Sequence, residues 1–223
     1  MADEEFHHRT VLVTGGSRGI GRAICTRLAA TGARIAINYA ANQAAAAETL
    51  ALVTAGGGTG ALFQADVSDL DQMKQMYTNN EAQLGPVDMV VANAGVARAG
   101  DNIDMDFDIW NEMMRVNLDG TFHTIWLAKD GMLARGFGRI VCISSAVGLA
   151  RNPLAPDRLI AYGTSKAAIV GLSRSCASAL GPTSRVNCIA PGFIETEMTE
   201  NASEEGRRKL RDLTPLGRFG QPE

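Results

Sequence analysis

Thr14-Gly15-Gly16-Ser17-Arg18-Gly19-Ile20-Gly21 is the stretch of sequence that decides the fold. It follows the short apolar run Thr10–Val13 and leads into a helical pattern at Ile20–Ala30. Glycines at such a point permit positive φ angles and let backbone N–H groups approach a pyrophosphate, which the helix dipole also attracts. The alternative is a tight turn with no ligand. The position between a first strand and a first helix favours a nucleotide site, and we predict cofactor contacts from Gly15, Ser17, Arg18, Gly19, Ile20 and Gly21.

Outward from this turn, short apolar runs alternate with longer stretches of helical spacing. This alternation predicts a parallel sheet with helices on both faces, so we expect an α/β fold, a Rossmann-type doubly wound parallel sheet in a single domain over residues 1–223. The expected strands are Thr10–Val13, Arg34–Asn38, Ala61–Ala65, Met89–Ala92, Ile140–Ile143 and Val186–Ile189. The expected helices are Ile20–Ala30, Ala44–Leu52, Leu70–Leu84, Phe107–Arg135 and Ala161–Leu180. Because the chain stops at Glu223 in an expected loop, we expect a C-terminal helix and the last strand to be missing.

The composition excludes several classes of protein. A formal net charge of −3 argues against binding to nucleic acid through a basic surface. The chain starts with acidic residues instead of a signal peptide, and no apolar run is long enough for a membrane span. The cysteines have no metal-binding spacing and are interpreted as buried thiols of a reducing compartment. We therefore expect a cytoplasmic protein with a small-molecule substrate, no metal, no nucleic-acid partner and no membrane segment.

The end of the second expected strand bears on which dinucleotide binds. An acidic side chain there would hydrogen-bond the ribose 2′-hydroxyl of NAD. The segment 37–42 contains no Asp or Glu, and Arg18 lies within the glycine-rich turn, so we predict NADP(H), with Asn38, Tyr39 and Ala40 at the cofactor. The alternative for Arg18 is a solvated surface arginine.

Tyr162 and Lys166 are four residues apart on an expected helix, so their side chains emerge on the same face. A free phenol titrates near pH 10, too high for a base at neutral pH. A neighbouring ammonium and an oxidised nicotinamide would lower that pKa, so we expect Tyr162 to exchange a proton with a hydroxyl or carbonyl oxygen. The alternative is a packed tyrosine beside a solvated lysine.

The glycine-rich turn and the Tyr-x3-Lys pair together resemble the short-chain dehydrogenase/reductase family, and the resemblance extends over nearly the whole chain. It implies that Ser145 holds the substrate oxygen, with the adjacent Ser144 as its competitor, and that Asn117 kinks its helix and supports a proton relay. Tyr162 and Lys166 would also contact the cofactor, Lys166 through the nicotinamide ribose. Asp66 would bind the adenine amino group; its alternative role is a helix N-cap shared with Ser68. The remaining cofactor residues that the resemblance implies are Val67, Asn93, Ala94, Gly95, Pro191, Gly192, Ile194 and Thr196.

Within the family the chain is similar to 3-oxoacyl-[acyl-carrier-protein] reductases, which share Pro191–Thr196 and the Gly-Arg-Ile that precedes the serine. This similarity implies an acyl-thioester ketone as substrate and acyl carrier protein as partner, with Arg135, Arg151 and Arg158 as basic docking candidates. The segment between Ser145 and Tyr162 is longer than expected, so a sugar or another small secondary alcohol is the alternative substrate.

Two further expectations come from the resemblance. The charged segment 195–214 is similar to a mobile substrate lid, the alternative being a solvated helix. Relatives associate through the helices at Phe107–Arg135 and Ala161–Leu180, so we expect a homo-oligomer, a tetramer or a dimer. The rival to an enzyme is a protein that senses NADP(H) without turning it over, and a third possibility is an incomplete, inactive fragment.

Overall fold

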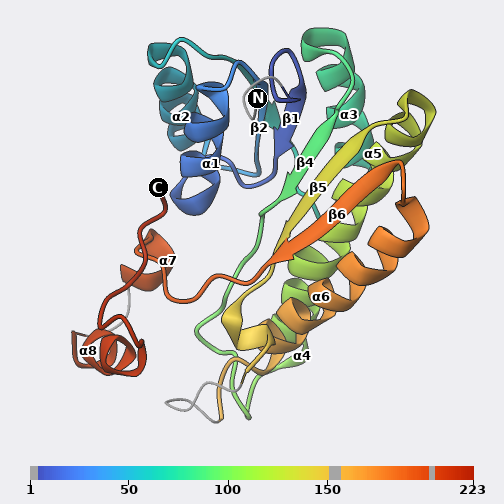
Figure 1. The fold of residues 1–223 in the computed structure, drawn as a ribbon. Helices are drawn as coiled ribbons and strands as arrows, with labels where there is room; N and C mark the ends of the chain where they lie inside the picture. The colour runs from blue at the N-terminus through green and yellow to red at the C-terminus, as the bar shows by residue number, and fades with distance from the viewer. Residues whose placement is uncertain (1–4, 151–156, 201–203) are drawn as a thin grey trace.

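The computed structural model describes residues 5–150, 157–200 and 204–223. Its centre is a six-stranded parallel sheet, as expected (Figure 1). The strands lie in the order β3-β2-β1-β4-β5-β6. Strands β1 to β3 therefore extend the sheet to one side, and β4 to β6 extend it to the other, starting next to β1. Their bounds are β1 Thr10–Val13, β2 Arg34–Tyr39, β3 Thr59–Gln64, β4 Met89–Ala92, β5 Gly138–Ile143 and β6 Ser184–Ile189.

Helices cover both faces of this sheet. On one face α1 and α2 pack on β1 and β2 through residues such as Cys25 and Val53. On the other face α3, α5 and α6 bury Met73, Ile125 and Ile169 against the strands. The helices are α1 Gly19–Ala29, α2 Gln43–Ala55, α3 Leu70–Leu84, α4 Phe107–Met113, α5 Gly120–Arg135, α6 Ile160–Leu180, α7 Glu197–Glu200 and α8 Glu204–Leu213. The expected α/β fold is therefore confirmed.

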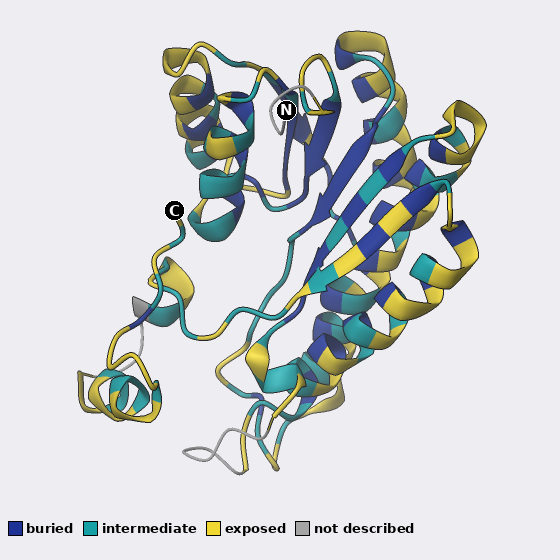
Figure 2. Ribbon diagram, viewed as in Figure 1, coloured by how far each residue is buried: buried dark blue, intermediate teal, exposed yellow. Residues whose placement is uncertain are grey.

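The strands differ in how far they are buried. β1 and β4 are buried along their whole length, whereas β6 alternates buried and exposed residues. Its Val186 packs on the α6 side, and Ile189 is 53% exposed. Figure 2 shows exposed positions that alternate with buried ones along β6. No helix among the described residues is both apolar enough and long enough to cross a membrane.

The long helix expected at Phe107–Arg135 is interrupted at its centre. Between α4 and α5 the residues Met114–Asp119 form a π-helical turn, which contains the buried Asn117. α-Helical turns on either side continue directly into it, so the three pieces form one rod. π-Helical turns inside α-helices occur frequently at functional sites.

Candidate active site

The glycine-rich turn has the shape that pyrophosphate binding needs. Gly15 and Gly19 have φ angles of +62° and +52°, in the left-handed region. Gly21 lies so close to the preceding strand end that an added Cβ would meet the carbonyl oxygen of Gly15 at 2.2 Å. Only glycine fits there. The turn can therefore lie directly against the end of β1, and the first backbone N–H groups of α1 can face a bound phosphate.

Two asparagines hold the turn in place. Asn93, after β4, donates from Nδ2 to the carbonyl oxygens of Thr14 at 2.9 Å and Gly15 at 3.2 Å. Asn38, at the end of β2, accepts from the N–H of Gly15 at 3.3 Å and donates both Nδ2 hydrogens to backbone oxygens. Asn38 is buried, so its side chain shapes the turn and has no N–H left for a cofactor. The Asn38 side chain therefore cannot donate a hydrogen bond to the cofactor, and a cofactor contact through the rest of the residue stays a prediction.

The C-terminal segment lies beside the same turn. Arg18 forms an ion pair with Glu197 of α7, and both side chains are largely exposed. The side chain of Thr196 lies 3.3 Å from the position that a Cβ would take at Gly19. In the same segment Arg207 pairs with Glu195 at 3.1 Å, and Ile194 bridges to Gly220. Arg18 is thus engaged with the segment 195–214 and is not simply a solvated side chain.

Asp66 and Val67 lie at the carboxyl end of β3. Asp66 accepts from both the N–H and the hydroxyl of Ser68, at 2.9 and 2.8 Å. The N-cap of α3 is Asp69, which accepts from two N–H groups of the first turn, so the alternative N-cap role for Asp66 was wrong. Val67 packs against Gly120 at the start of α5.

Lys166 is buried in the interior beside Tyr162. Its Nζ lies 5.8 Å from the centroid of the Tyr162 ring and donates to the carbonyl oxygen of Ile143 at 3.0 Å. Removal from water lowers the pKa of Lys166 to about 8. The alternative of a solvated lysine is therefore wrong.

The pKa of Tyr162 differs from the expected direction. Burial raises it above its usual value of 10, and the interaction with the Ser145 hydroxyl offsets only part of that rise. In the cofactor-free protein the ammonium of Lys166 donates to the Ile143 carbonyl oxygen. In the protein alone, Tyr162 is a protonated phenol at neutral pH.

The two adjacent serines after β5 point in different directions. Ser144 is buried and donates to the main-chain oxygen of Lys166 at 2.6 Å. Ser145 caps the short 3₁₀ turn Ala146–Gly148 and places its hydroxyl at Tyr162. Side chains alternate along a strand, and here this alternation leaves Ser145 as the serine at the site.

Asn117 joins the loop after β4 to α6. Its Oδ1 accepts from the N–H of Val96 at 2.8 Å, and its Nδ2 donates to the Val96 carbonyl and to the Ser165 hydroxyl, each at 3.0 Å. An added Cβ at Gly95 would lie 3.2 Å from both Asn117 Oδ1 and Lys166 Nζ. The loop, the π-helical turn and α6 therefore converge on one point, where the sequence predicted the catalytic residues.

The segment after β6 comes back to the same place. The carbonyl oxygen of Pro191 accepts from the N–H of Ala146, next to Ser145, at 2.8 Å. Gly192, Ile194 and Thr196 follow and lead to the turn at Gly19. The predicted residues after β1, β4, β5 and β6 thus gather at the carboxyl edge of the sheet, where doubly wound sheets bind ligands.

Sequence reasoning missed Asp101, in the loop between β4 and α4. Its carboxylate accepts from the main-chain N–H groups of Ala161 at 2.8 Å and Tyr162 at 2.9 Å. The only signal was indirect: no capping side chain precedes α6, since its N-cap position is Leu159.

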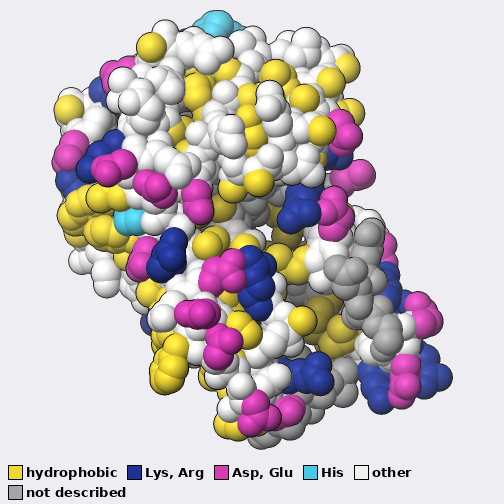
Figure 3. Space-filling model, turned by 180° about the vertical axis from the view of Figure 1, so that it is seen from behind, with side chains coloured by type: hydrophobic (Ala, Val, Ile, Leu, Met, Phe, Trp, Pro, Cys, Tyr) yellow, Lys and Arg dark blue, Asp and Glu magenta, His cyan; other side chains and the backbone are white. Residues whose placement is uncertain are grey.

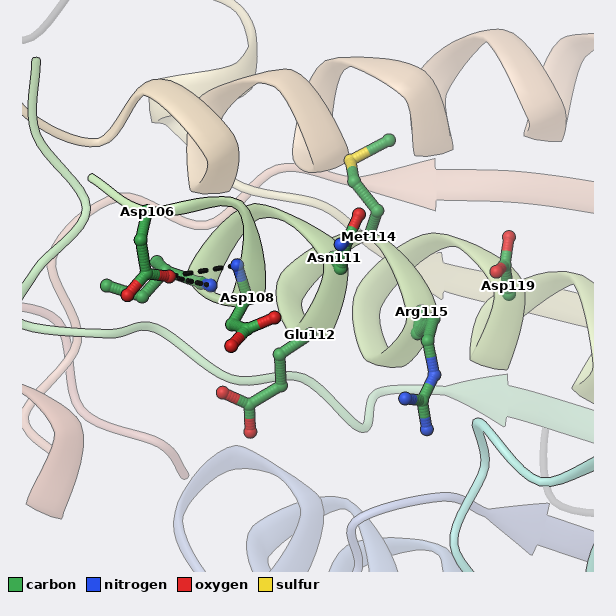
Figure 4. A pocket seen from close by; sticks show the side chains of 8 residues that line it. Asp106, Asp108, Asn111, Glu112, Met114, Arg115 and Asp119 are labelled. Atoms are coloured by element: carbon green, nitrogen blue, oxygen red, sulfur yellow. Dashed lines mark hydrogen bonds between the residues drawn. The ribbon is translucent and has the colours of Figure 1, made fainter. Parts of the chain in front are cut away.

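A hollow of about 750 Å³ lies elsewhere, along α4 and the π-helical turn (Figure 4). It is mainly acidic, and none of its lining residues belongs to the predicted site.

Arg135, a docking candidate, pairs with Asp88 just before β4, at the opposite edge of the sheet. It is therefore not near the site entrance. Arg158 is exposed, and Arg151 lies outside the described residues. Among the described residues no group of His, Cys, Asp or Glu could hold a metal ion.

Residues 9–207 match the family model described as short chain dehydrogenase. A 3-oxoacyl-[acyl-carrier-protein] reductase from Staphylococcus aureus is 37% identical over 214 residues, which span 96% of this chain and 85% of that protein. A 3-oxoacyl-[acyl-carrier-protein] reductase from Synechocystis is 36% identical, with the same coverage of both chains.

Solved structures agree with these matches. The crystal structure of a 3-oxoacyl-[acyl-carrier protein] reductase from Brucella melitensis is 35% identical and superposes with a TM-score of 0.88, covering 97% of this chain and 81% of that one. A reductase of the same description from Brucella melitensis, solved with bound NAD, is 34% identical with a TM-score of 0.86, covering 97% of this chain and 80% of that one. The chain therefore belongs to the short-chain dehydrogenase/reductase family and is an oxidoreductase that interconverts a carbonyl and a hydroxyl group.

Proposed function

We propose that this protein reduces a ketone to a secondary alcohol with NADPH, and that Tyr162 supplies the proton. The observation that carries the proposal is the meeting of Tyr162, Ser145 and Lys166 at the carboxyl edge of the sheet, beside the glycine-rich turn. The cofactor, when bound, supplies the hydride. The residues of the chain hold the carbonyl, donate the proton and exclude water.

The residues around the turn fit a dinucleotide. The close approach at Gly21 excludes a side chain, and the left-handed φ angles of Gly15 and Gly19 shape the turn in the way that pyrophosphate binding requires. We assign the adenine contact to Asp66 and Val67 and the adenosine ribose to Tyr39 and Ala40. The lack of a carboxylate after β2, with Arg18 in the turn, supports NADP(H) over NAD(H), because a carboxylate would repel the 2′-phosphate. The contacts with phosphates and nicotinamide fall to Gly15–Gly21, Asn93–Gly95 and Pro191–Thr196.

The protonation states support reduction. Tyr162 with a raised pKa is a phenol that can donate its proton to a carbonyl oxygen. Ser145 is placed to donate to the same oxygen and hold it as negative charge develops. Lys166 then favours the phenolate left behind and contacts the nicotinamide ribose. Asn117, joined to the same region through Ser165, supports the return of a proton to Tyr162.

For the substrate we propose a 3-oxoacyl thioester, carried on an acyl carrier protein. The support is the activity of the relatives, which are 3-oxoacyl-[acyl-carrier-protein] reductases, together with the shared Pro191–Thr196. Arg158 is exposed close to Tyr162 in sequence and offers one basic contact for an acidic carrier. We assign to the segment 195–214 the role of a lid over the substrate. The ion pair between Arg18 and Glu197 connects the start of this segment to the glycine-rich turn. A sugar or a small secondary alcohol is the alternative outcome of the substrate test.

We also propose a homo-oligomer that forms through α4, α5 and α6. Large hydrophobic side chains are exposed on the first two: Phe107 at 85% and Trp126 at 49%, with Phe122 stacked on Trp126. Figure 3 shows hydrophobic side chains gathered along one edge of the molecule's rear face. Exposed apolar patches of this kind mark protein interfaces. Light scattering tests this: we expect a dimer or tetramer, and a monomer at micromolar concentration would contradict it.

The test of the proposed activity follows NADPH absorbance with acetoacetyl-CoA, a sugar-derived ketone and a simple cyclic ketone. We expect the thioester to be reduced fastest and NADH to be used less efficiently. Tyr162→Phe should bind NADPH with unchanged affinity and lose turnover by at least a hundredfold. Turnover retained in Tyr162→Phe would overturn the mechanism, and binding of NADPH without oxidation on any ketone would favour a sensor.

A further inference from the structure

The helix that carries Tyr162 begins without a capping side chain of its own. Leu159 occupies the N-cap position with a φ angle of +60°, and its side chain can accept no hydrogen bond. The first N–H groups of a helix need acceptors, and here a residue about sixty positions earlier supplies them. Asp101 accepts from Ala161 N–H through Oδ1 and from Tyr162 N–H through Oδ2, and its main-chain oxygen accepts from Leu159 N–H at 3.0 Å.

Asp101 is only 2% exposed, so its carboxylate is enclosed by the protein at the start of α6. A buried carboxylate is costly unless it is hydrogen-bonded, and the positive end of a helix is a place where it is stabilised. An antiparallel bridge between Asn102 and Arg158 ties the two loops together just outside it. The loop is anchored at its other end through the bonds between Val96 and Asn117.

We propose that Asp101 is a positioning residue that fixes the first turn of α6 and thereby the Tyr162 hydroxyl. This inference rests on the proposed role of Tyr162 as proton donor. Terminal turns of helices fray, and a proton donor there would lose its alignment with Ser145. The carboxylate binds the main-chain N–H of Tyr162 itself, so it restrains the residue directly. The same contact links the loop beside the cofactor site to the acid–base residue.

The test compares Asp101→Ala and Asp101→Asn with the matched control Asp106→Ala. Asp106 also caps a helix, α4, with its carboxylate: its Oδ1 accepts from Asp108 N–H at 2.9 Å and Ile109 N–H at 3.1 Å (Figure 4). α4 carries none of the predicted site residues. Each variant is measured for kcat and KM on the fastest ketone of the panel, for NADPH affinity by fluorescence, and for amide exchange in residues 157–166 by mass spectrometry.

We expect Asp101→Ala to lower kcat by 10- to 100-fold, with KM and NADPH affinity within threefold of the wild type. Amide exchange in residues 157–166 should become at least tenfold faster. Asp101→Asn keeps one acceptor oxygen, so it should recover much of kcat. Asp106→Ala should keep kcat within twofold and leave exchange in 157–166 unchanged.

Three outcomes would overturn the inference: an Asp101→Ala protein with wild-type kcat, equal losses of kcat in Asp101→Ala and Asp106→Ala, or unchanged amide exchange in residues 157–166 of Asp101→Ala. If Asp101→Ala does not fold, Asp101→Asn decides by the same measurements, with a smaller loss of kcat expected. Tyr162→Phe separates the two proposals. If that variant retains turnover, the proposed mechanism fails, whereas the exchange data still judge whether Asp101 holds the turn.

Discussion

The ammonium of Lys166 donates a hydrogen bond to the carbonyl oxygen of Ile143 at 3.0 Å, inside the protein and beside the Tyr162 ring. The bond ties α6 to the end of β5. It satisfies one of the three hydrogens of the ammonium, and burial still lowers the pKa of Lys166 to about 8.

This shift makes stability depend on pH. In the unfolded chain Lys166 keeps its proton up to its ordinary pKa of 10.5. Between pH 8 and 10.5 the unfolded state therefore binds more protons than the folded state, and the free energy of unfolding increases as pH rises. The reason is that the folded protein no longer has to bury a charged ammonium. The penalty is fully present below pH 8, and we expect about 3 kcal/mol. Lys166→Met should therefore be more stable than wild type at pH 7 by an amount of this order, and inactive. Urea unfolding at pH 7, 8 and 9 measures the gap, which should narrow with rising pH; a constant gap would contradict the argument.

Gly21→Ala tests the close approach in the glycine-rich turn. Because the new Cβ would meet the Gly15 oxygen at 2.2 Å, the turn must move, and we expect a loss of about 1–3 kcal/mol in unfolding free energy. NADPH affinity should fall by at least tenfold. The matched control is Gly171→Ala in α6, where a Cβ meets nothing within 4 Å. It should gain roughly 0.5–1 kcal/mol from helix propensity and bind NADPH normally.

Ser144→Ala and Ser145→Ala should separate stability from activity. Ser144 donates to the main-chain oxygen of Lys166 inside the protein, so its loss should cost about 1 kcal/mol of unfolding free energy and leave kcat within a fewfold. Ser145→Ala should leave the unfolding midpoint nearly unchanged and lower kcat by about a hundredfold, as for other oxyanion donors. The reverse pattern would assign the substrate contact to Ser144.

Arg18 and Glu197 should affect cofactor choice in opposite directions. Arg18→Ala removes a cation from the turn, and we expect NADPH affinity to fall by roughly ten- to a hundredfold, with little effect on NADH. Glu197→Gln weakens an exposed ion pair that is worth about 1 kcal/mol or less, so it should raise NADPH affinity by at most about fivefold. Titration of both variants with NADPH and NADH measures the change; equal losses for both cofactors in Arg18→Ala would remove Arg18 from 2′-phosphate recognition.

The parts that the sequence predicted well share a local signal. The glycine-rich turn is recognised from its place between a strand and a helix, and Tyr162 and Lys166 from their spacing within one helix. Leu70–Leu84 was predicted as a helix from its spacing and forms α3 with the same bounds. Arg34–Asn38 was also predicted as a strand, but the sequence did not show that the Asn38 side chain is buried against the glycine-rich turn.

The parts that were missed depend on contacts between distant residues. Asp101 reaches Tyr162 across 61 positions, and nothing in the periodicity of either segment indicates it. The direction in which the Tyr162 pKa shifts depends on how deeply the phenol is buried and on its interaction with the Ser145 hydroxyl. Both facts arise only when β5 and α6 pack together.

The π-helical turn at Met114–Asp119 has a consequence for how this chain can change in length. Each residue of an α-helix turns the next side chain by about 100° around the axis. Deleting one residue between Asn117 and Gly120 would therefore swing Asn117 away from Val96 and Ser165 while α5 stayed packed on the sheet. We therefore expect the number of residues between Asn117 and the start of α5 to be as constrained as their identity.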